Sequence, residues 1–185
     1  MKVINLFASP GTGKTTTGQI LSGLLSMADF KTEYIPEFAK FATLSKNQSA
    51  LSDQIYMFAK QENRLNVLRE ANLDFVVMDG PLPLALLFQP EQYYQFYEPL
   101  VMEVFSSYDN HNFYLRKNPA FSYKTNGRNE TESEASVLDL RLRAILARHQ
   151  IMGDEFMVEK SLPFRLFTEI TGMEAPLTMV ESALC

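Results

Sequence analysis

The 185-residue sequence contains a single cysteine, Cys185, which is its last residue. One cysteine cannot form an intrachain disulfide, and it cannot supply a cysteine-rich zinc site. Both kinds of cross-link are therefore excluded as sources of stability. A reducing compartment suits this composition, so we expect a cytoplasmic protein.

Long apolar runs are also missing. No stretch approaches the roughly 18 to 20 apolar residues that a membrane-spanning helix requires. The apolar segment Met1 to Phe7 is too short for a signal peptide. We therefore expect a soluble chain with no membrane partner.

An excess of positive charge is absent as well. Lys and Arg number 17 against 22 Asp and Glu, which gives a formal net charge of −5. This balance argues against a broadly basic protein that coats nucleic acid, although a local basic patch can still bind phosphate groups. Hydrophobic residues make up 46% of the chain and charged residues 21%, which is ordinary globular usage. We expect one domain over residues 1–185.

What is present is an alternation of strand-like and helix-like segments. The first strand is predicted over Lys2 to Phe7, because this apolar run ends at a turn of proline and glycine. The other predicted strands are Thr32 to Pro36, Phe75 to Met78, Asn112 to Leu115 and a last one near Phe156 to Val158. The predicted helices are Thr15 to Met27, residues 51–72, Gln92 to Phe105, Glu130 to His149 and a short helix after the last strand. Strands that alternate with helices predict an α/β fold built on a parallel sheet.

The first strand leads into Ala8-Ser-Pro-Gly-Thr-Gly-Lys-Thr15, a glycine-rich segment at the start of a helix. Backbone N–H groups at a helix N-terminus can surround the phosphates of a nucleotide, and Gly11 and Gly13 keep side chains out of their way. Lys14 is expected to contact the β- and γ-phosphates of ATP, and the hydroxyl of Thr15 is expected to ligate Mg²⁺. The predicted ATP-binding residues are Pro10, Gly11, Thr12, Gly13, Lys14, Thr15 and Thr16. The alternative is a turn without a ligand, and Ala8, which replaces the first glycine of the pattern, would be strained if its φ were positive.

Two acidic residues follow predicted strands. Asp79 comes directly after Met78, at the sheet edge where open α/β folds bind ligands, so we predict that it holds Mg²⁺ and takes part in catalysis. Its alternative role is to cap a helix that begins at Pro81. Glu37 follows the second strand and is predicted to bind the acceptor and to act on its hydroxyl as a general base, or else to be a first-turn residue of a helix. Whether Glu37 or Asp79 handles the acceptor proton stays open.

Polar residues form one stripe of the helix predicted over residues 51–72. Gln54, Gln61 and Arg64 recur at helical spacing and are predicted to bind the acceptor, whereas the alternative is a solvated face. The buried side of the same helix is predicted to carry Ile55, Phe58, Ala59, Leu65 and Leu68.

Residues 116–130 interrupt the alternation. Arg116, Lys117, Lys124 and Arg128 are basic, and no acidic residue lies between the first and the last of them. A lid that closes over ATP would use such residues to neutralise charge on the transferred group and to exclude water. We predict an ATP contact for Arg116 and a catalytic contact for Arg128. The alternative is a solvated surface loop.

Several of these segments stand in the order of a known group. Ala8 to Thr15, Ile35-Pro-Glu-Phe-Ala-Lys40, Gln61-Glu62, the strand ending at Asp79 and Asn126-Gly-Arg128 resemble the nicotinamide-riboside-kinase-like (NadR-like) branch of P-loop kinases over roughly residues 1–150. The resemblance implies a P-loop NTPase fold with three α/β/α layers, a five-stranded mostly parallel sheet and a lid. It also implies ATP and Mg²⁺ as cofactors, and phosphorylation of a hydroxyl on a nucleoside-like acceptor.

Among phage-encoded members of that branch, the chain is similar to the 5-hydroxymethyluracil DNA kinases, which phosphorylate a hydroxymethyl group on a base in DNA. This similarity implies that the acceptor is DNA containing a modified pyrimidine, and that the protein acts in the cytoplasm of the host. The alternative acceptor is a free nucleoside or nucleotide. A further alternative is an ATPase switch that acts on a protein partner. The sequence leaves the acceptor and the oligomeric state open.

Overall fold

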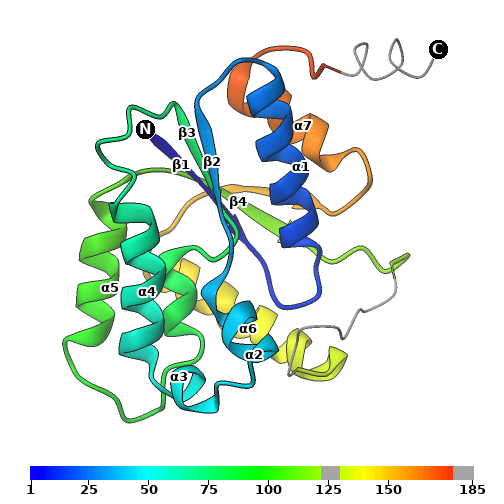
Figure 1. The fold of residues 1–185 in the computed structure, drawn as a ribbon. Helices are drawn as coiled ribbons and strands as arrows, with labels where there is room; N and C mark the ends of the chain where they lie inside the picture. The colour runs from blue at the N-terminus through cyan, green and yellow to red at the C-terminus, as the bar shows by residue number, and fades with distance from the viewer. Residues whose placement is uncertain (122–129, 177–185) are drawn as a thin grey trace.

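The computed structural model describes residues 1–121 and 130–176, and Figure 1 shows a central sheet with helices around it. In this part of the chain, five strands pair in the order β2-β3-β1-β4-β5, and each pairing is parallel. The strands are β1 (Lys2–Phe7), β2 (Thr32–Ile35), β3 (Phe75–Met78), β4 (Asp109–Arg116) and β5 (Asp154–Met157). The predicted α/β fold with a five-stranded parallel sheet is confirmed.

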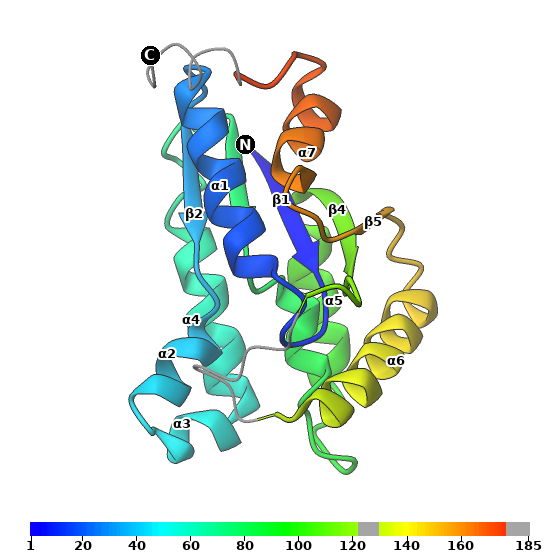
Figure 2. The same cartoon turned by 90° about the vertical axis from the view of Figure 1, so that its right-hand side faces the viewer.

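Successive residues of β1 point to opposite faces of the sheet, and both faces are apolar. Ile4 and Leu6 belong to a buried cluster that includes side chains of α1 (Lys14–Met27) and α7 (Leu162–Thr171). Val3 and Phe7 belong to a second cluster on the other face, whose helices are α4 (Gln54–Asn66), α5 (Tyr97–Ser106) and α6 (Glu132–Arg148). The result is the expected arrangement of three layers, which Figure 2 shows in a second view.

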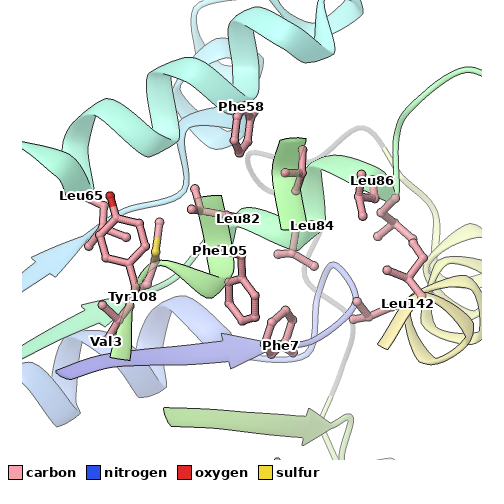
Figure 3. Close-up of a cluster of buried hydrophobic side chains, with 14 of the residues drawn as sticks. Val3, Phe7, Phe58, Leu65, Leu82, Leu84, Leu86, Phe105, Tyr108 and Leu142 are labelled. Atoms are coloured by element: carbon pink, nitrogen blue, oxygen red, sulfur yellow. The ribbon is translucent and has the colours of Figure 1, made fainter. Parts of the chain in front are cut away.

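The larger core cluster lies between the sheet and α4, α5 and α6 (Figure 3). Phe7 meets Phe105 edge-on, with 6.4 Å between the ring centroids. Leu82 and Leu84 join the same cluster from a 3₁₀ helix (Leu82–Leu86). The segment that follows β3 is therefore fixed against the core by its own leucines.

The helix predicted over residues 51–72 is shorter in the structure, where α4 spans Gln54–Asn66. Residues 51 and 52 belong instead to a separate helix, α3 (Gln48–Ser52), which α2 (Phe38–Leu44) precedes. The side chains of Asn47 and Asp53 accept hydrogen bonds from the backbone N–H groups of Ala50 and Tyr56, so each of them starts a new helix.

The buried side of α4 also differs from the prediction. Ile55 is 45% exposed, and Ala59 is exposed too. The buried residues are Gln54, Phe58, Gln61 and Leu65, which recur every three or four positions along one helical face. Gln54 and Gln61 of the predicted polar stripe are thus buried, so the alternative of a solvated face is wrong for these two residues.

Four other predicted elements shift by a few residues, and one of them is β4, which begins at Asp109 and not at Asn112. The helix predicted from Gln92 begins at Tyr97 as α5. The helix predicted from Glu130 begins at Glu132 as α6, where Thr131 and Glu134 form a capping box. The last strand covers residues 154–157.

Most of the lid predicted over residues 116–130, including Lys124 and Arg128, lies outside the described residues. Among the helices within the described ranges, none is long and apolar enough to cross a membrane.

α1 contains two glycines in different surroundings. A Cβ added at Gly18 would lie 3.0 Å from Cε2 of Tyr34 and 3.2 Å from Cδ1 of Leu6, whereas one at Gly23 would meet no atom within 4 Å. We expect Gly23→Ala to raise the free energy of unfolding by roughly 0.5–1 kcal/mol, because alanine loses less backbone entropy than glycine in a helix. Gly18→Ala should lower it by about 1–3 kcal/mol, because the added methyl overpacks the layer between α1 and the sheet. Urea denaturation of both variants measures the difference, and equal stabilities would contradict the close packing at Gly18.

Candidate active site

The segment between β1 and α1 forms a loop that leads into the N-terminus of α1. Gly11 and Gly13 have φ values of 85° and 114°, which glycine adopts without a steric penalty. The backbone of Ala8 does not have a positive φ, and its side chain is buried in the cluster under α1. The replacement of glycine by Ala8 therefore causes no strain.

Hydroxyl groups hold this loop from the inside. Thr12 Oγ1 donates a hydrogen bond to the carbonyl oxygen of Ser9 at 2.9 Å, and it lies 3.2 Å from Ser9 Oγ. Both side chains are buried. The loop is thus preorganised at the N-terminus of a 14-residue helix, where the helix dipole and the free N–H groups favour an anion.

Lys14 places its ammonium group inside the loop. The residue is 8% exposed, and Nζ donates to the carbonyl oxygen of Ala8 at 3.4 Å. Nζ also lies 3.5 Å from Oε2 of Glu37. An anion that enters the loop would therefore meet a cation that is already paired with a carboxylate.

Asp79 accepts two hydrogen bonds on one carboxylate oxygen. The hydroxyl of Thr15 donates to Oδ2 at 2.7 Å, and the hydroxyl of Tyr34 donates to the same atom at 2.9 Å. Asp79 is fully buried, and the 3₁₀ helix that follows shows no side-chain cap within the described residues. The alternative role of Asp79 as a helix cap is therefore not observed. Its side chain faces the phosphate loop.

Glu37 occupies the N-cap position of α2, but its side chain makes no capping hydrogen bond to the described backbone. The backbone on either side of it is held by α4. Gln61 Oε1 accepts a hydrogen bond from the N–H of Phe38 at 2.9 Å, and Arg64 donates to the carbonyl oxygen of Pro36 at 3.0 Å. Two residues predicted to bind the acceptor thus hold the segment that carries Glu37.

The pKa of Glu37 is raised above its ordinary value, chiefly because the surrounding protein shields its partly exposed carboxyl group from water. The Lys14 ammonium lowers this pKa and the Asp79 carboxylate raises it, so Lys14 offsets only part of the effect of burial. A carboxylate with a raised pKa is a better proton acceptor near neutral pH. The surroundings of Glu37 therefore suit a general base.

The phosphate loop and Glu37 border one cleft of about 540 Å³. The predicted ATP-binding residues from Pro10 to Thr16 line it, and so does Gln54. Its apolar wall consists of Leu51, Met57, Leu84, Leu87 and Phe88. A narrower extension reaches Gln61 between α4 and the 3₁₀ helix. The cleft therefore joins an anion-binding loop to an apolar chamber, and its volume lies in the usual range for small-molecule sites.

The two predicted arginines are placed differently. Arg116 ends β4, and its Nε lies 2.6 Å from Oε1 of Glu155, which also pairs with Arg143 of α6. Arg116 does not line the cleft described above. Its contact with ATP stays a prediction, and Arg128 lies outside the described residues.

Comparison with known protein families matches residues 3–156 to a family described as an AAA domain. The match extends from β1 into β5 and includes the phosphate loop, Glu37 and Asp79. The chain belongs to this AAA domain family. Comparison with curated protein sequences gave no match.

Solved structures share the fold of this AAA domain at low sequence identity. The NadR protein in complex with NAD and AMP-PNP aligns with a TM-score of 0.68 and 17% identity, over 94% of this chain and 50% of that chain. Deoxyadenosine kinase from M. mycoides with bound dATP aligns with a TM-score of 0.55 and 16% identity, over 94% and 100% of the two chains. The AAA domain thus spans about half the length of the NadR chain. The predicted P-loop NTPase fold is confirmed.

The AAA domain has a suitable place for Mg²⁺ beside Thr15. Oδ1 of Asp79 is buried and accepts no hydrogen bond from any described residue. Thr15 donates its proton to the other carboxylate oxygen, so the lone pairs of its own oxygen are left for a cation. Proteins commonly hold Mg²⁺ with one or two side chains together with nucleotide phosphates and water. The residues present fit this ion.

Tyr34 is a residue of this AAA domain site that the sequence analysis missed. Its place beside Asp79 depends on the pairing of β2 with β3, a long-range property for which the sequence has no local signal. The apolar wall was missed as well. Leu87 and Phe88 follow β3 in a segment without helical or strand periodicity, so no pattern pointed to them.

Proposed function

We propose that this AAA domain is an ATP-dependent kinase that transfers the γ-phosphoryl group to a hydroxyl on a nucleoside-like acceptor. The observation that carries the proposal is that Lys14, Thr15 and Glu37 line one cleft, with Asp79 buried behind Thr15 and hydrogen-bonded to it. Phosphoryl transfer requires a phosphate cradle, a metal-binding acid and a group that orients the attacking hydroxyl. These side chains supply all three.

The donor half of the site is the phosphate loop. Its N–H groups would bind the phosphates of ATP, and Lys14 would turn from Glu37 toward the β- and γ-phosphates. Thr15 and Asp79 would hold Mg²⁺, which neutralises charge on the phosphate oxygens. The similar fold of NadR, whose solved complex contains AMP-PNP, supports a donor of this type.

The acceptor half begins at Glu37. Its carboxylate would accept the proton of the acceptor hydroxyl while the hydroxyl oxygen forms a bond to the γ-phosphorus and ADP leaves. When Lys14 turns to the phosphates, Glu37 loses the ion pair that lowers its pKa, so its strength as a base rises. The apolar wall beside it, which includes Phe88, suits a flat ring.

The finer proposal is that the hydroxyl belongs to 5-hydroxymethyluracil in phage DNA. It rests on the resemblance of the segments around Lys14, Glu37 and Asp79 to that group of kinases, and a base in duplex DNA would have to leave its stack to reach Glu37. The second candidate is a free nucleoside or nucleotide. The likeness of the chain to deoxyadenosine kinase over that enzyme's whole length supports this candidate. Both candidates use the same donor half.

The acceptor is tested with radiolabelled ATP and Mg²⁺ in parallel reactions that contain DNA with 5-hydroxymethyluracil, unmodified DNA or free nucleosides. We expect label in the DNA that carries the hydroxymethyl group and none in unmodified DNA. Label in free nucleosides alone would favour the second candidate. ATP hydrolysis that a protein partner stimulates, without any labelled acceptor, would favour an ATPase switch over a kinase.

A further inference from the structure

Tyr34 joins the layer of α1 to the carboxyl end of β3. It lies in β2 in register with Val77 of β3, and its hydroxyl reaches Oδ2 of Asp79 at 2.9 Å. Its ring packs in the cluster under α1, where a Cβ at Gly18 would lie 3.0 Å from Cε2 of the ring. Because Gly18 has no side chain, the ring fits there and its hydroxyl is held at Asp79.

Two donors share one oxygen of Asp79. Thr15 and Tyr34 both donate to Oδ2, while Oδ1 is buried and accepts no hydrogen bond from any described residue. Rotation of the carboxylate would break both hydrogen bonds at once, and bonds to an ionised acceptor are among the stronger ones in proteins. The free oxygen of Asp79 is therefore held in one direction.

Thr15 has two tasks in the proposed kinase, because its oxygen must serve both Asp79 and the cation. Tyr34 donates to Asp79 without facing the nucleotide, since it does not line the cleft.

We propose that Tyr34 is a positioning residue, which holds the carboxylate of Asp79 so that Oδ1 is presented to the Mg²⁺ that accompanies ATP. The inference rests on the proposed function, since it assigns a residue to the metal site of the same kinase.

The test measures nucleotide binding in the absence of an acceptor. Calorimetry with a non-hydrolysable ATP analogue, once with MgCl₂ and once with EDTA, gives the gain in affinity that the ion contributes. Tyr34→Phe removes one oxygen atom and should reduce this gain about tenfold, because partners of metal-binding side chains are worth about 10–100-fold in metal affinity. The affinity in EDTA should not change. Asp79→Asn removes the metal-binding carboxylate itself, so it gives the largest reduction of the Mg²⁺-dependent gain in affinity that Tyr34→Phe can be compared with.

The matched control is Tyr114→Phe. This tyrosine lies in β4, and its hydroxyl donates to Asp139 of α6, so the same atom is removed away from the phosphate loop. In this variant we expect MgCl₂ to increase the affinity for the ATP analogue as much as in the wild type. Thermal unfolding of both variants is measured alongside, because a purely structural role of Tyr34 would lower the Tm and leave the gain unaltered.

Gly18→Ala tests the contact between Tyr34 and Asp79 by moving the ring of Tyr34 instead of removing its hydroxyl group. Its methyl group displaces the ring of Tyr34, so the Mg²⁺-dependent gain should fall without any change to a hydroxyl group. The double variant with Tyr34→Phe should lose no more gain than Tyr34→Phe alone, because both changes act through one contact. A full gain in Tyr34→Phe overturns the inference and leaves the kinase proposal standing. If the wild-type chain does not bind the ATP analogue at all, both are overturned.

Discussion

Replacement of Lys14 by methionine is expected to slow phosphoryl transfer by about 10³-fold, because it removes the preorganised charge of a buried side chain at the phosphate loop. Methionine keeps the apolar stem of the lysine, and the side chain belongs to the loop and not to either core cluster. The fold should therefore survive. Single-turnover assays with radiolabelled ATP and the acceptor that takes up label in the parallel reactions measure the loss.

Loss of the Lys14 ammonium has a second consequence for Glu37. In the nucleotide-free chain the ammonium lowers the pKa of that carboxyl group, so Lys14→Met should raise the pKa further and move the acid limb of the kcat/KM profile, which reports the free enzyme, to higher pH. Lys31→Met is the control. Lys31 is exposed and precedes β2, at the end of the sheet opposite the phosphate loop, and its replacement should change neither rate nor profile. A folded Lys14→Met variant with the wild-type rate would refute the proposed donor site.

The fold was predictable where local signals were strong. The apolar run at β1 and the helical spacing in α1 gave bounds that agree with the structure to within one residue. Residues 51–72 were misread because Asp53 interrupts the helical pattern by capping the backbone, and periodicity does not show whether a polar residue continues a helix or starts one. The order of the strands was not predicted, because the pairing of β3 with both β1 and β2 is a long-range property with no local signal.

The sequence predicted the acidic residues of the candidate site, but not the contacts that hold them in position. Glu37 and Asp79 both follow strands, and the carboxyl ends of parallel strands meet at one edge of a sheet. Helical spacing correctly grouped Gln61 and Arg64, but it does not reveal whether that face meets a ligand or backbone. In the structure both side chains bind the backbone around Glu37.

Glu37→Gln is expected to reduce kcat by about 10²- to 10⁴-fold, the usual contribution of a general base. Glutamine has nearly the same shape but cannot take the proton of the acceptor hydroxyl. The affinity for an ATP analogue should change little, because the phosphate loop is intact. Glu33→Gln is the matched control, since it removes an exposed carboxylate from β2, the strand that precedes Glu37. If the loss appears only in stability and kcat is kept, Glu37 is a structural residue at the start of α2.

The pH dependence separates these roles further. A base must be ionised, so the rate should fall as the pH drops through the folded-state pKa of Glu37, which lies above the ordinary value of 4.5. Glu37→Gln should lack this acid limb of the rate profile.

The raised pKa of Glu37 also means that folding favours the protonated carboxyl group. Glu37 therefore contributes stability below pH 4.5, and this contribution is lost as the pH rises through the folded-state pKa. At neutral pH the ionised carboxylate lowers the stability of the fold. Glu37→Gln should thus melt at the same or a higher temperature than wild type at pH 7, and this difference should shrink toward pH 4, which thermal unfolding at both pH values measures. A variant that is less stable at pH 7 would show that the ion pair with Lys14 outweighs the burial of the charge.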